Sequence, residues 1–153
     1  MHGAIDIFER FLINDEWSYQ KKEHDDGRTC SFKMLIKGKH CQFTTHVVID
    51  EELNQVLIYS VCPNPIEEAR RLEIMEYLTR ANYGLLIGNF EMDITDGEVR
   101  FKTSLRSDDQ IGESTMKSLF MVNLMMHDKY YKGIMSIIYG MSTPKMAIDL
   151  VET

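Results

Sequence analysis

The sequence has few of the features that mark exported, membrane-spanning or metal-binding proteins. Its 153 residues include three cysteines (Cys30, Cys41 and Cys62), and none has the Cys-x-x-Cys spacing of a zinc or dithiol site. An odd cysteine count without an export signal predicts reduced, mostly buried thiols. The longest apolar runs, such as residues 119–122, are far shorter than the ~18 residues that a membrane span requires. The N-terminus does not resemble a signal peptide, so we expect a cytoplasmic protein.

Basic residues are too few for a typical nucleic-acid-binding protein. The net charge is −7, and the doublets Lys21-Lys22 and Arg70-Arg71 each lie among carboxylates. A protein that binds nucleic acid needs a basic surface to displace counterions from the phosphates. An anionic membrane attracts the same kind of surface. We therefore expect neither nucleic acid nor a membrane as the partner.

Motifs for catalysis and for cofactor binding are also missing. The sequence contains no nucleophile elbow, Walker loop, GxGxxG fingerprint or HExxH helix. His40 and His46 are expected on one strand about 20 Å apart, too far to share a metal ion. We read the His24-Asp25-Asp26 stretch as an ordinary polar turn. The sequence thus predicts a protein that is not an enzyme and has no cofactor or metal.

What is present indicates one globular domain over residues 1–153. Hydrophobic residues make up 44% and charged residues 27%, which is ordinary for a folded domain. Apolar spacing predicts a helix over residues 5–12, a weak edge strand over 17–23 and strands over 30–37 and 55–61. Further strands are expected within two hairpins.

Turn residues predict a register for each hairpin. Gly38-Lys39 suits a two-residue type II′ turn, and Asp96-Gly97 suits a type I′ turn. The first turn would give the pairs Ile36–Cys41, Met34–Phe43, Phe32–Thr45 and Cys30–Val47. The second would give Ile94–Val99, Met92–Phe101, Asp93–Arg100 and Glu91–Lys102. In both hairpins the apolar side chains then share one face, which supports these registers.

Three more helices follow from capping signals and periodicity. Residues 64–67 predict a helix start, with an inward stripe of Ile66, Ala69, Leu72, Met75, Leu78 and Asn82. Residues 113–139 predict a long helix, with a kink or break at Gly133. Thr143-Pro144 caps a short last helix. The order α-β-β-β-α-β-β-α indicates an α+β fold, an antiparallel sheet of about five strands packed by helices.

The long helix carries the candidate binding site. One stripe is expected to pack on the sheet: Met116, Leu119, Phe120, Asn123, His127, Tyr130, Ile134 and Ile137. A second apolar stripe lies beside it and consists of Met121, Leu124, Met125, Tyr131 and Met135. Methionine is common at adaptable binding surfaces, and a helix with two apolar faces needs two packing partners. Another helix of the chain, a second copy and a client protein all remain open as the second partner.

Several blocks of the sequence resemble the YbjN domain family. They are residues 59–63, 79–84, 88–91, 96–102 and 133–140. The resemblance implies a fold like that of type III secretion chaperones, and family members are described as bacterial sensory transduction regulators. It implies no active-site residues.

Two functions follow from these observations. With the acidic charge and the Met-rich stripe, the resemblance leads us to expect a homodimeric, non-catalytic protein-binding module, chaperone-like or a regulatory adaptor. The alternative is a small-molecule-sensing domain whose pocket lies between the sheet and the long helix, lined by Tyr130, Phe101 and Met92.

Overall fold

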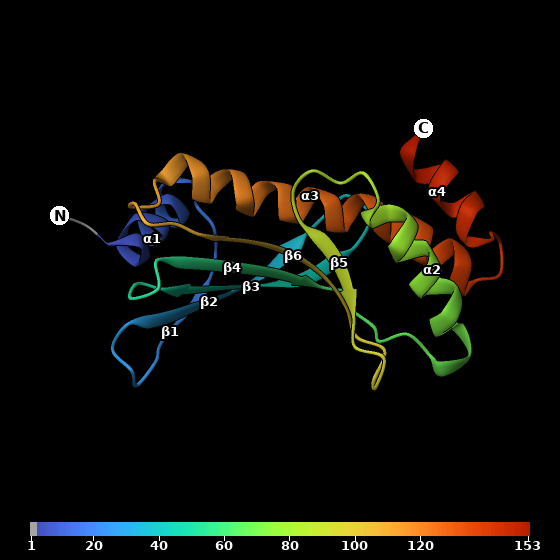
Figure 1. Ribbon diagram of the computed structural model, residues 1–153, viewed down its shortest axis with the longest axis horizontal. Coiled ribbons are helices and arrows are strands. Elements are labelled where there is room, and N and C mark those ends of the chain that lie inside the picture. Colours follow the sequence, from blue (N-terminus) through green and yellow to red (C-terminus); the bar gives the residue numbers. More distant parts are fainter. Residues whose placement is uncertain (1–2) are drawn as a thin grey trace.

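Alternation of apolar and polar residues builds six strands into one antiparallel sheet. The computed structural model describes residues 3–153 (Figure 1). The strands are β1 (Gln20–Glu23), β2 (Thr29–Lys37), β3 (Gln42–Asp50), β4 (Gln55–Val61), β5 (Asn89–Met92) and β6 (Val99–Arg106), in the sheet order β1-β2-β3-β4-β6-β5. The α+β class is confirmed. The sheet has one strand more than about five because the short segment β1 pairs with β2 at the edge.

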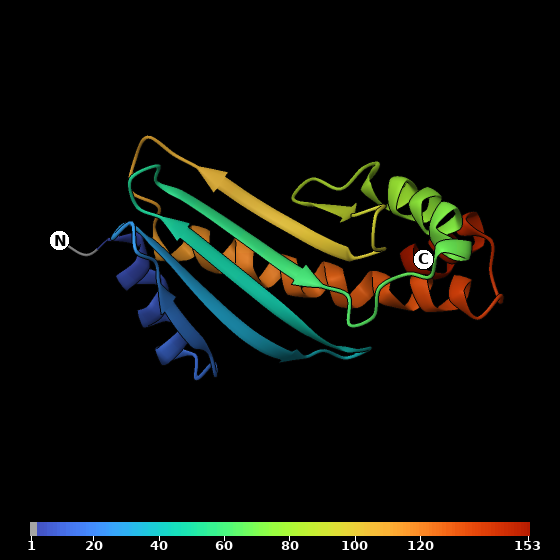
Figure 2. The same ribbon diagram turned by 90° about the horizontal axis from the view of Figure 1, so that it is seen from below.

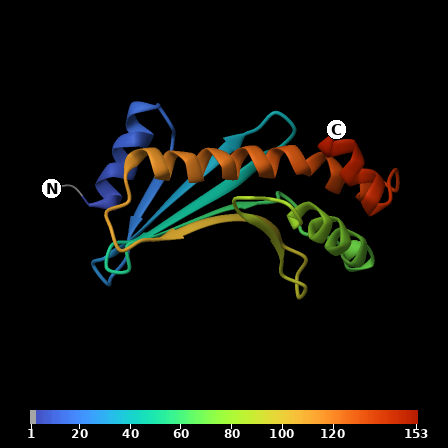
Figure 3. The ribbon, with the colours of Figure 1, turned by 45° about the horizontal axis from the view of Figure 1, so that its top comes forward.

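Within residues 3–153, four helices complete the fold and cover one face of the sheet. They are α1 (Ala4–Asn14), α2 (Arg71–Asn82), α3 (Glu113–Ile138) and α4 (Pro144–Glu152), and a 3₁₀ turn, η1 (Glu68–Arg70), precedes α2. Helix α3 runs along the sheet with α1 beside its first turns, while α2 and α4 pack near its other end (Figures 1 and 3). Viewed from below, the strands lie in front and α3 lies behind them (Figure 2).

The core consists of two apolar clusters joined by a polar zone. The first cluster includes Phe8 and Phe120, and the second includes Tyr77 and Phe101. Between them along α3, β3, β4 and β6 lie buried polar residues: Thr45, Ser60, Thr103, Asn123 and His127. The Thr45 and Ser60 hydroxyls are hydrogen-bonded at 2.7 Å, and the Asn123 amide donates to the Ile58 and Phe101 carbonyls. A buried polar group is costly unless it is hydrogen-bonded, so these bonds are needed to bury the zone.

The register predicted for the first hairpin is wrong by two residues. Ile36 pairs with Phe43 rather than with Cys41, and residues 38–41 form a four-residue turn. Asp128 of α3 selects this turn, because its carboxylate accepts the backbone N–H groups of Lys39, His40 and Cys41 at 3.0, 2.9 and 3.2 Å. A shift of two residues keeps every side chain on its face, so the apolar pattern could not detect it.

The second hairpin is also shifted by two residues. Met92 pairs with Val99 and Glu91 with Arg100, so that residues 93–98 form a longer loop. The Asp93 carboxylate accepts the Thr95 N–H, and its carbonyl accepts the Gly97 N–H at 2.7 Å. The side chain of Ile94 lies in this loop and is exposed. Asp93 therefore organises the loop instead of pairing with Arg100.

Helix α2 begins at Arg71, not at Asn64 as predicted. Residues 62–67 are extended because the N–H groups of Cys62 and Ile66 donate to the carbonyls of Val99 and Gly97, both at 2.8 Å. The inward residues are Ile74, Tyr77, Leu78 and Ala81, whereas Leu72 is exposed. Only Leu78 of the predicted stripe is both on the helix and buried. Contacts with α3 and α4 select the face that packs.

The other predictions for the helices have mixed outcomes. Helix α1 and the cap of α4 are confirmed, and the Thr143 hydroxyl accepts the Met146 N–H at 3.2 Å. The kink or break at Gly133 is wrong, because α3 is one continuous helix. Gly133 serves close packing instead, since a Cβ there would lie 2.0 Å from the Tyr77 hydroxyl oxygen.

Replacing Asp128 with alanine is expected to loosen the β2–β3 turn. The substitution removes the acceptor for three backbone N–H groups, and we expect a loss of about 1–3 kcal/mol in the free energy of unfolding. Urea unfolding measures the loss, and hydrogen exchange at Lys39–Cys41 locates it. Asp149→Ala, which removes an exposed carboxylate 3.9 Å from Lys145, is the matched control. Equal stability of the two variants would contradict the anchoring role of Asp128.

Candidate functional site

The structure divides the second stripe of α3 into two parts. Leu124 is buried and Met121 half-buried against the first core cluster, whereas Met125 is 59% exposed. Tyr131 and Met135 lie farther along the helix and are half-buried. The turn held by Asp128 lies against the helix between these two parts, so the stripe is not one continuous surface.

Tyr131 and Met135 line a cleft of about 420 Å³. One wall is the end of α3, and the other is the extended segment before α2. The lining residues are Cys62, Asn64, Pro65, Glu67, Arg70, Tyr131, Met135, Ile138 and Tyr139. An apolar lining with a few polar groups is typical of a binding site, and the volume lies within the usual range.

Hydrogen bonds hold the cleft in shape. The bonds from Cys62 and Ile66 to the Val99 and Gly97 carbonyls tie one wall to the β5–β6 hairpin. At the rim, Arg70 donates to the Glu73 carboxylate at 3.2 Å. The cleft can therefore receive an apolar group and offer polar contacts at its edge.

The titratable groups in and near the cleft are not poised for nucleophilic chemistry. Burial raises the pKa of the Cys62 thiol and of the Tyr131 hydroxyl. Burial, with the neighbouring Asp128 carboxylate, raises the pKa of Cys41 to about 12. A thiolate, not a thiol, is the reactive form, so at neutral pH these cysteines are weak nucleophiles.

The first stripe of α3 faces the sheet as predicted. Asn123 and His127 are both buried core residues, and the His127 ring lies 4.3 Å from the Phe43 ring, measured between centroids. Neither ring nitrogen of His127 has a hydrogen-bond partner among residues 3–153. Burial lowers the pKa of His127 to about 4, although the Asp128 carboxylate opposes the shift. The imidazole is therefore neutral at pH 7.

Aromatic rings fill the space between the sheet and α3, where the small-molecule-sensing function was expected to have its pocket. Tyr130 and Phe101 are buried, and the Phe90 ring lies 5.5 and 4.7 Å from them. The predicted pocket between the sheet and the long helix is therefore wrong in its position. The cleft beside Tyr131 and Met135 is the better candidate for a ligand.

The described residues form neither a metal-binding cluster nor a membrane-spanning helix. Residues 3–153 include no group of three or more His, Cys, Asp or Glu side chains placed to hold a metal ion. In the same range, no helix has the length and apolar character needed to cross a bilayer.

Sequence reasoning missed the role of the segment before α2. Cys62, Pro65 and Arg70 form a wall of the cleft, but the capping signal placed most of this segment in a helix. It also overlooked the uncovered sheet face. Outward-facing apolar residues on a central strand, such as Leu57 and Tyr59, were an available signal for that face.

Comparison with known proteins places this fold in a family. A family described as "YbjN: Putative bacterial sensory transduction regulator" matches residues 4–135. The chain belongs to the YbjN family. The description of that family names a regulator.

Two solved structures are similar to this YbjN-family chain. A structure titled "Crystal structure of YbjN, a putative transcription regulator from E. coli" is similar with a TM-score of 0.56 and 12% identity, over 82% of this chain and 86% of that chain. A chain of the "HopA1-SchA Chaperone-Effector Complex" has a TM-score of 0.48 and 19% identity, over 80% and 89% of the two chains. No curated protein matches the sequence. At 12% identity, the first likeness shows a shared fold alone.

Proposed function

We propose that this YbjN-family protein is a non-catalytic cytoplasmic module that binds another protein, as a homodimeric chaperone-like or regulatory adaptor. The cleft lined by Tyr131 and Met135 carries the proposal. Aromatic and methionine side chains around a concave site suit an apolar anchor from a partner, and such anchors supply most of the binding energy in interfaces. The family description as a regulator supports the same class of function.

The five residues of the second stripe have different parts in this proposal. Tyr131 and Met135 contact the partner in the cleft, and exposed Met125 extends the contact surface toward the middle of α3. Met121 and Leu124 pack against the core and hold the helix in position. The polar groups at the cleft rim select the partner.

A second function, sensing of a small molecule, can use the same cleft. Its volume of about 420 Å³ suits a small ligand, and Asn64, Glu67 and Arg70 supply polar contacts. A ligand bound there would contact both α3 and the segment before α2.

Introducing a charge into the cleft is expected to abolish partner binding. The substitution Met135→Glu places a carboxylate among apolar walls, where an unpaired charge is costly to bury. An unpaired buried charge should cost more than about 1.4 kcal/mol, which corresponds to a tenfold loss in affinity. We therefore expect partner binding to weaken at least tenfold, and less partner to be captured from the native cytoplasm. Sedimentation velocity on the same proteins reports whether the homodimer depends on this surface.

The control is Met146→Glu, which makes the same change on the exposed face of α4. Circular dichroism must show that both variants fold. If Met135→Glu folds and keeps its mass and every partner, the proposal fails. If Met135→Glu instead abolishes stabilisation by a small metabolite, the sensing function takes its place.

A further inference from the structure

The face of the sheet away from α3 is left open. In Figure 2 this face is turned to the viewer, and no helix of residues 3–153 crosses it. The register places two rows of outward-facing residues across β2, β3, β4 and β6. One row is Lys33, His46, Tyr59 and Lys102, and the next is Leu35, Thr44, Val61 and Arg100.

Basic residues line both sides of this face. The outward-facing cations are Lys22, Lys33, Lys37, Arg100, Lys102 and Arg106. The acidic residues here are Asp50 and Glu91 on the strands and Glu98 at the rim. The whole chain carries −7, so this positive face stands out against an acidic molecule. The Glu91 carboxylate forms ion pairs with both Arg100 at 2.9 Å and Lys102 at 3.1 Å, so these three residues together carry one excess positive charge.

The centre of the face is hollowed, with Lys33 and Glu98 as the charged residues of its lining. The outward residues of β4 include Leu57, Tyr59 and Val61, and Leu35 on β2 is 62% exposed. Two adjoining hollows of about 480 and 420 Å³ share Lys33, Leu35 and Thr44. Next to β4, the Arg100 guanidinium lies 4.1 Å from the centroid of the Tyr59 ring. The face is thus a shallow trough of mixed polar and apolar residues, with Leu35, Tyr59 and Val61 as its apolar part and basic residues on β2 and β6 at its two sides.

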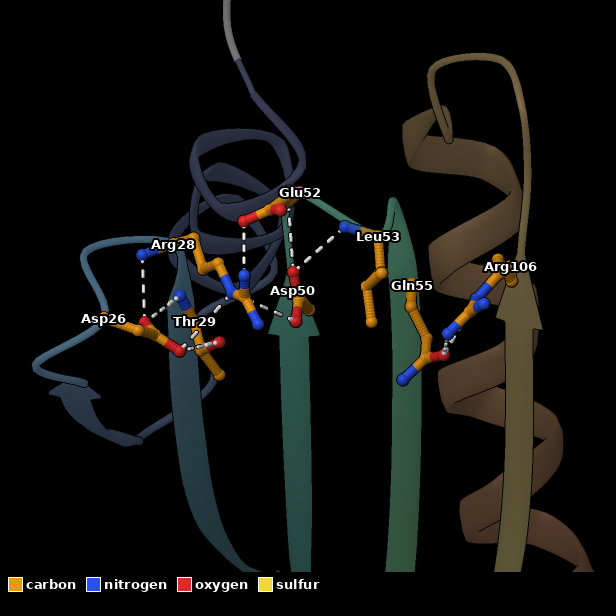
Figure 4. A network of polar contacts seen from close by, with 8 residues as sticks. All are labelled: Asp26, Arg28, Thr29, Asp50, Glu52, Leu53, Gln55 and Arg106. Atoms are coloured by element: carbon orange, nitrogen blue, oxygen red, sulfur yellow. Dashed lines mark hydrogen bonds and ion pairs between the residues drawn. The ribbon is translucent and has the colours of Figure 1, made fainter.

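The polar network at one end of the trough contains three carboxylates and two cations, so it has no excess of positive charge (Figure 4). Arg28 forms ion pairs with Glu52 and Asp50, and Arg106 donates to the Gln55 side chain. The Thr29 hydroxyl and two backbone N–H groups donate to Asp26 and hold its pKa at about 2. The unbalanced positive charge therefore lies farther along the face, around Lys33 and Lys37.

We propose that this trough binds an acidic amphipathic helix of a partner protein. Three strand spacings separate β2 from β6, or about 14 Å, which accommodates a helix about 10–12 Å across. The apolar stripe of such a helix covers Leu35, Tyr59 and Val61, and its acidic flanks face Lys33 and Lys102. The inference rests on the proposed function, that the protein binds a protein, but uses a different surface from the cleft.

Charge and surface chemistry favour this partner over nucleic acid. A polyanion would be repelled by the net charge of −7, whereas a short acidic helix adds few charges and buries apolar area. The outward residues of β3 and β4 in the centre include no lysine or arginine, whereas a phosphate backbone would need cationic donors there. An apolar stripe between acidic flanks matches both features.

The test uses a synthetic helical peptide with leucines on one face and glutamates on both flanks of that face. Fluorescence anisotropy compares it with the same peptide carrying lysines at the glutamate positions, and with single-stranded DNA. We expect the acidic peptide to bind at least about tenfold more tightly than the basic one, with affinity falling as salt rises. Lys33→Glu/Lys37→Glu should lower that affinity about tenfold or more, and Leu35→Ser should lower it severalfold.

Matched controls separate this proposal from the cleft. Lys129→Glu/Lys132→Glu makes the same charge change on exposed positions of α3 and should leave peptide binding unchanged. Met135→Glu should also leave it unchanged while abolishing the partner contact at the cleft. The proposal is overturned if the two peptides bind equally, if the acidic peptide does not bind, or if DNA binds more tightly than the acidic peptide.

Discussion

Lowering the pH from about 7 to about 5 is expected to reduce the free energy of unfolding by about 2 kcal/mol, through His127 alone. Its side chain is 1% exposed and neither ring nitrogen has a partner within residues 3–153. Burial lowers its pKa from 6.5 to about 4. The folded protein therefore resists protonation of a group that the unfolded chain protonates readily.

The direction of this effect follows from proton binding. Between pH 6.5 and about 4 the unfolded state binds more protons at His127 than the folded state does, so stability falls as the pH falls. Well above pH 6.5 the His127 side chain is neutral in both the folded and the unfolded state, so its titration no longer changes the free energy of unfolding. Carboxylates with lowered pKa values, such as Glu9 and Glu91, lose their contributions at lower pH, as they become protonated. The pH range in which His127 lowers stability therefore lies above the range in which these carboxylates do, and a titration of the free energy of unfolding against pH separates them.

Urea unfolding at a series of pH values measures the effect. His127→Leu removes the titrating group and its two unpaired nitrogens, so it should flatten the dependence between pH 7 and 5 and cost little at pH 7. His40→Gln, at an exposed histidine in the β2–β3 turn, is the control and should behave like the wild type. A slope that persists in His127→Leu would assign the acid sensitivity to other groups.

Gly133→Ala is expected to destabilise the protein by about 2–3 kcal/mol, although alanine is the better helix former. The added Cβ would lie 2.0 Å from the Tyr77 hydroxyl oxygen and 2.3 Å from its ring carbon. That hydroxyl donates to the Tyr130 carbonyl at 2.7 Å, so moving the ring also breaks a buried hydrogen bond. Overpacking and the lost bond together outweigh the gain of about 1 kcal/mol in helix propensity.

A double-mutant cycle with Tyr77→Leu tests this cause. The smaller side chain makes room for the Cβ, so the loss caused by Gly133→Ala should shrink sharply in the Tyr77→Leu background. Ser118→Ala, on the exposed side of the same helix, should change stability little. Equal losses from Gly133→Ala in both backgrounds would exclude the contact with Tyr77 as the reason.

Long, strongly periodic segments could be predicted from the sequence, and segments held by distant residues could not. The strand Gln55–Val61 and the helix Ala4–Asn14 agree with the prediction because their apolar spacing reports directly which face is buried. Both hairpin registers failed by two residues, since Asp128 and Asp93 stabilise longer turns than the local turn residues suggest. The start of α2 failed because strand-like hydrogen bonds to Val99 and Gly97 outweigh a capping sequence.

In the candidate site, too, local periodicity predicted some features and distant residues decided the others. Periodicity predicted the sheet-facing stripe of α3, and it placed Tyr131 and Met135, which line the cleft, in a second stripe. It could not show that Leu124 is buried, because the core cluster that covers it comes from other elements. The cleft likewise depends on a wall that lies about seventy positions away in the sequence.

The sequence by itself therefore determined the α+β class, the order of the elements and the inward face of α3, because these follow from the local period of apolar residues. The tertiary structure alone decided the registers, the start of α2, the close approach at Gly133 and the open basic face of the sheet. Each of these depends on contacts or coverage between residues far apart in the chain. Local periodicity carries no information about which distant group supplies a hydrogen bond or leaves a face uncovered.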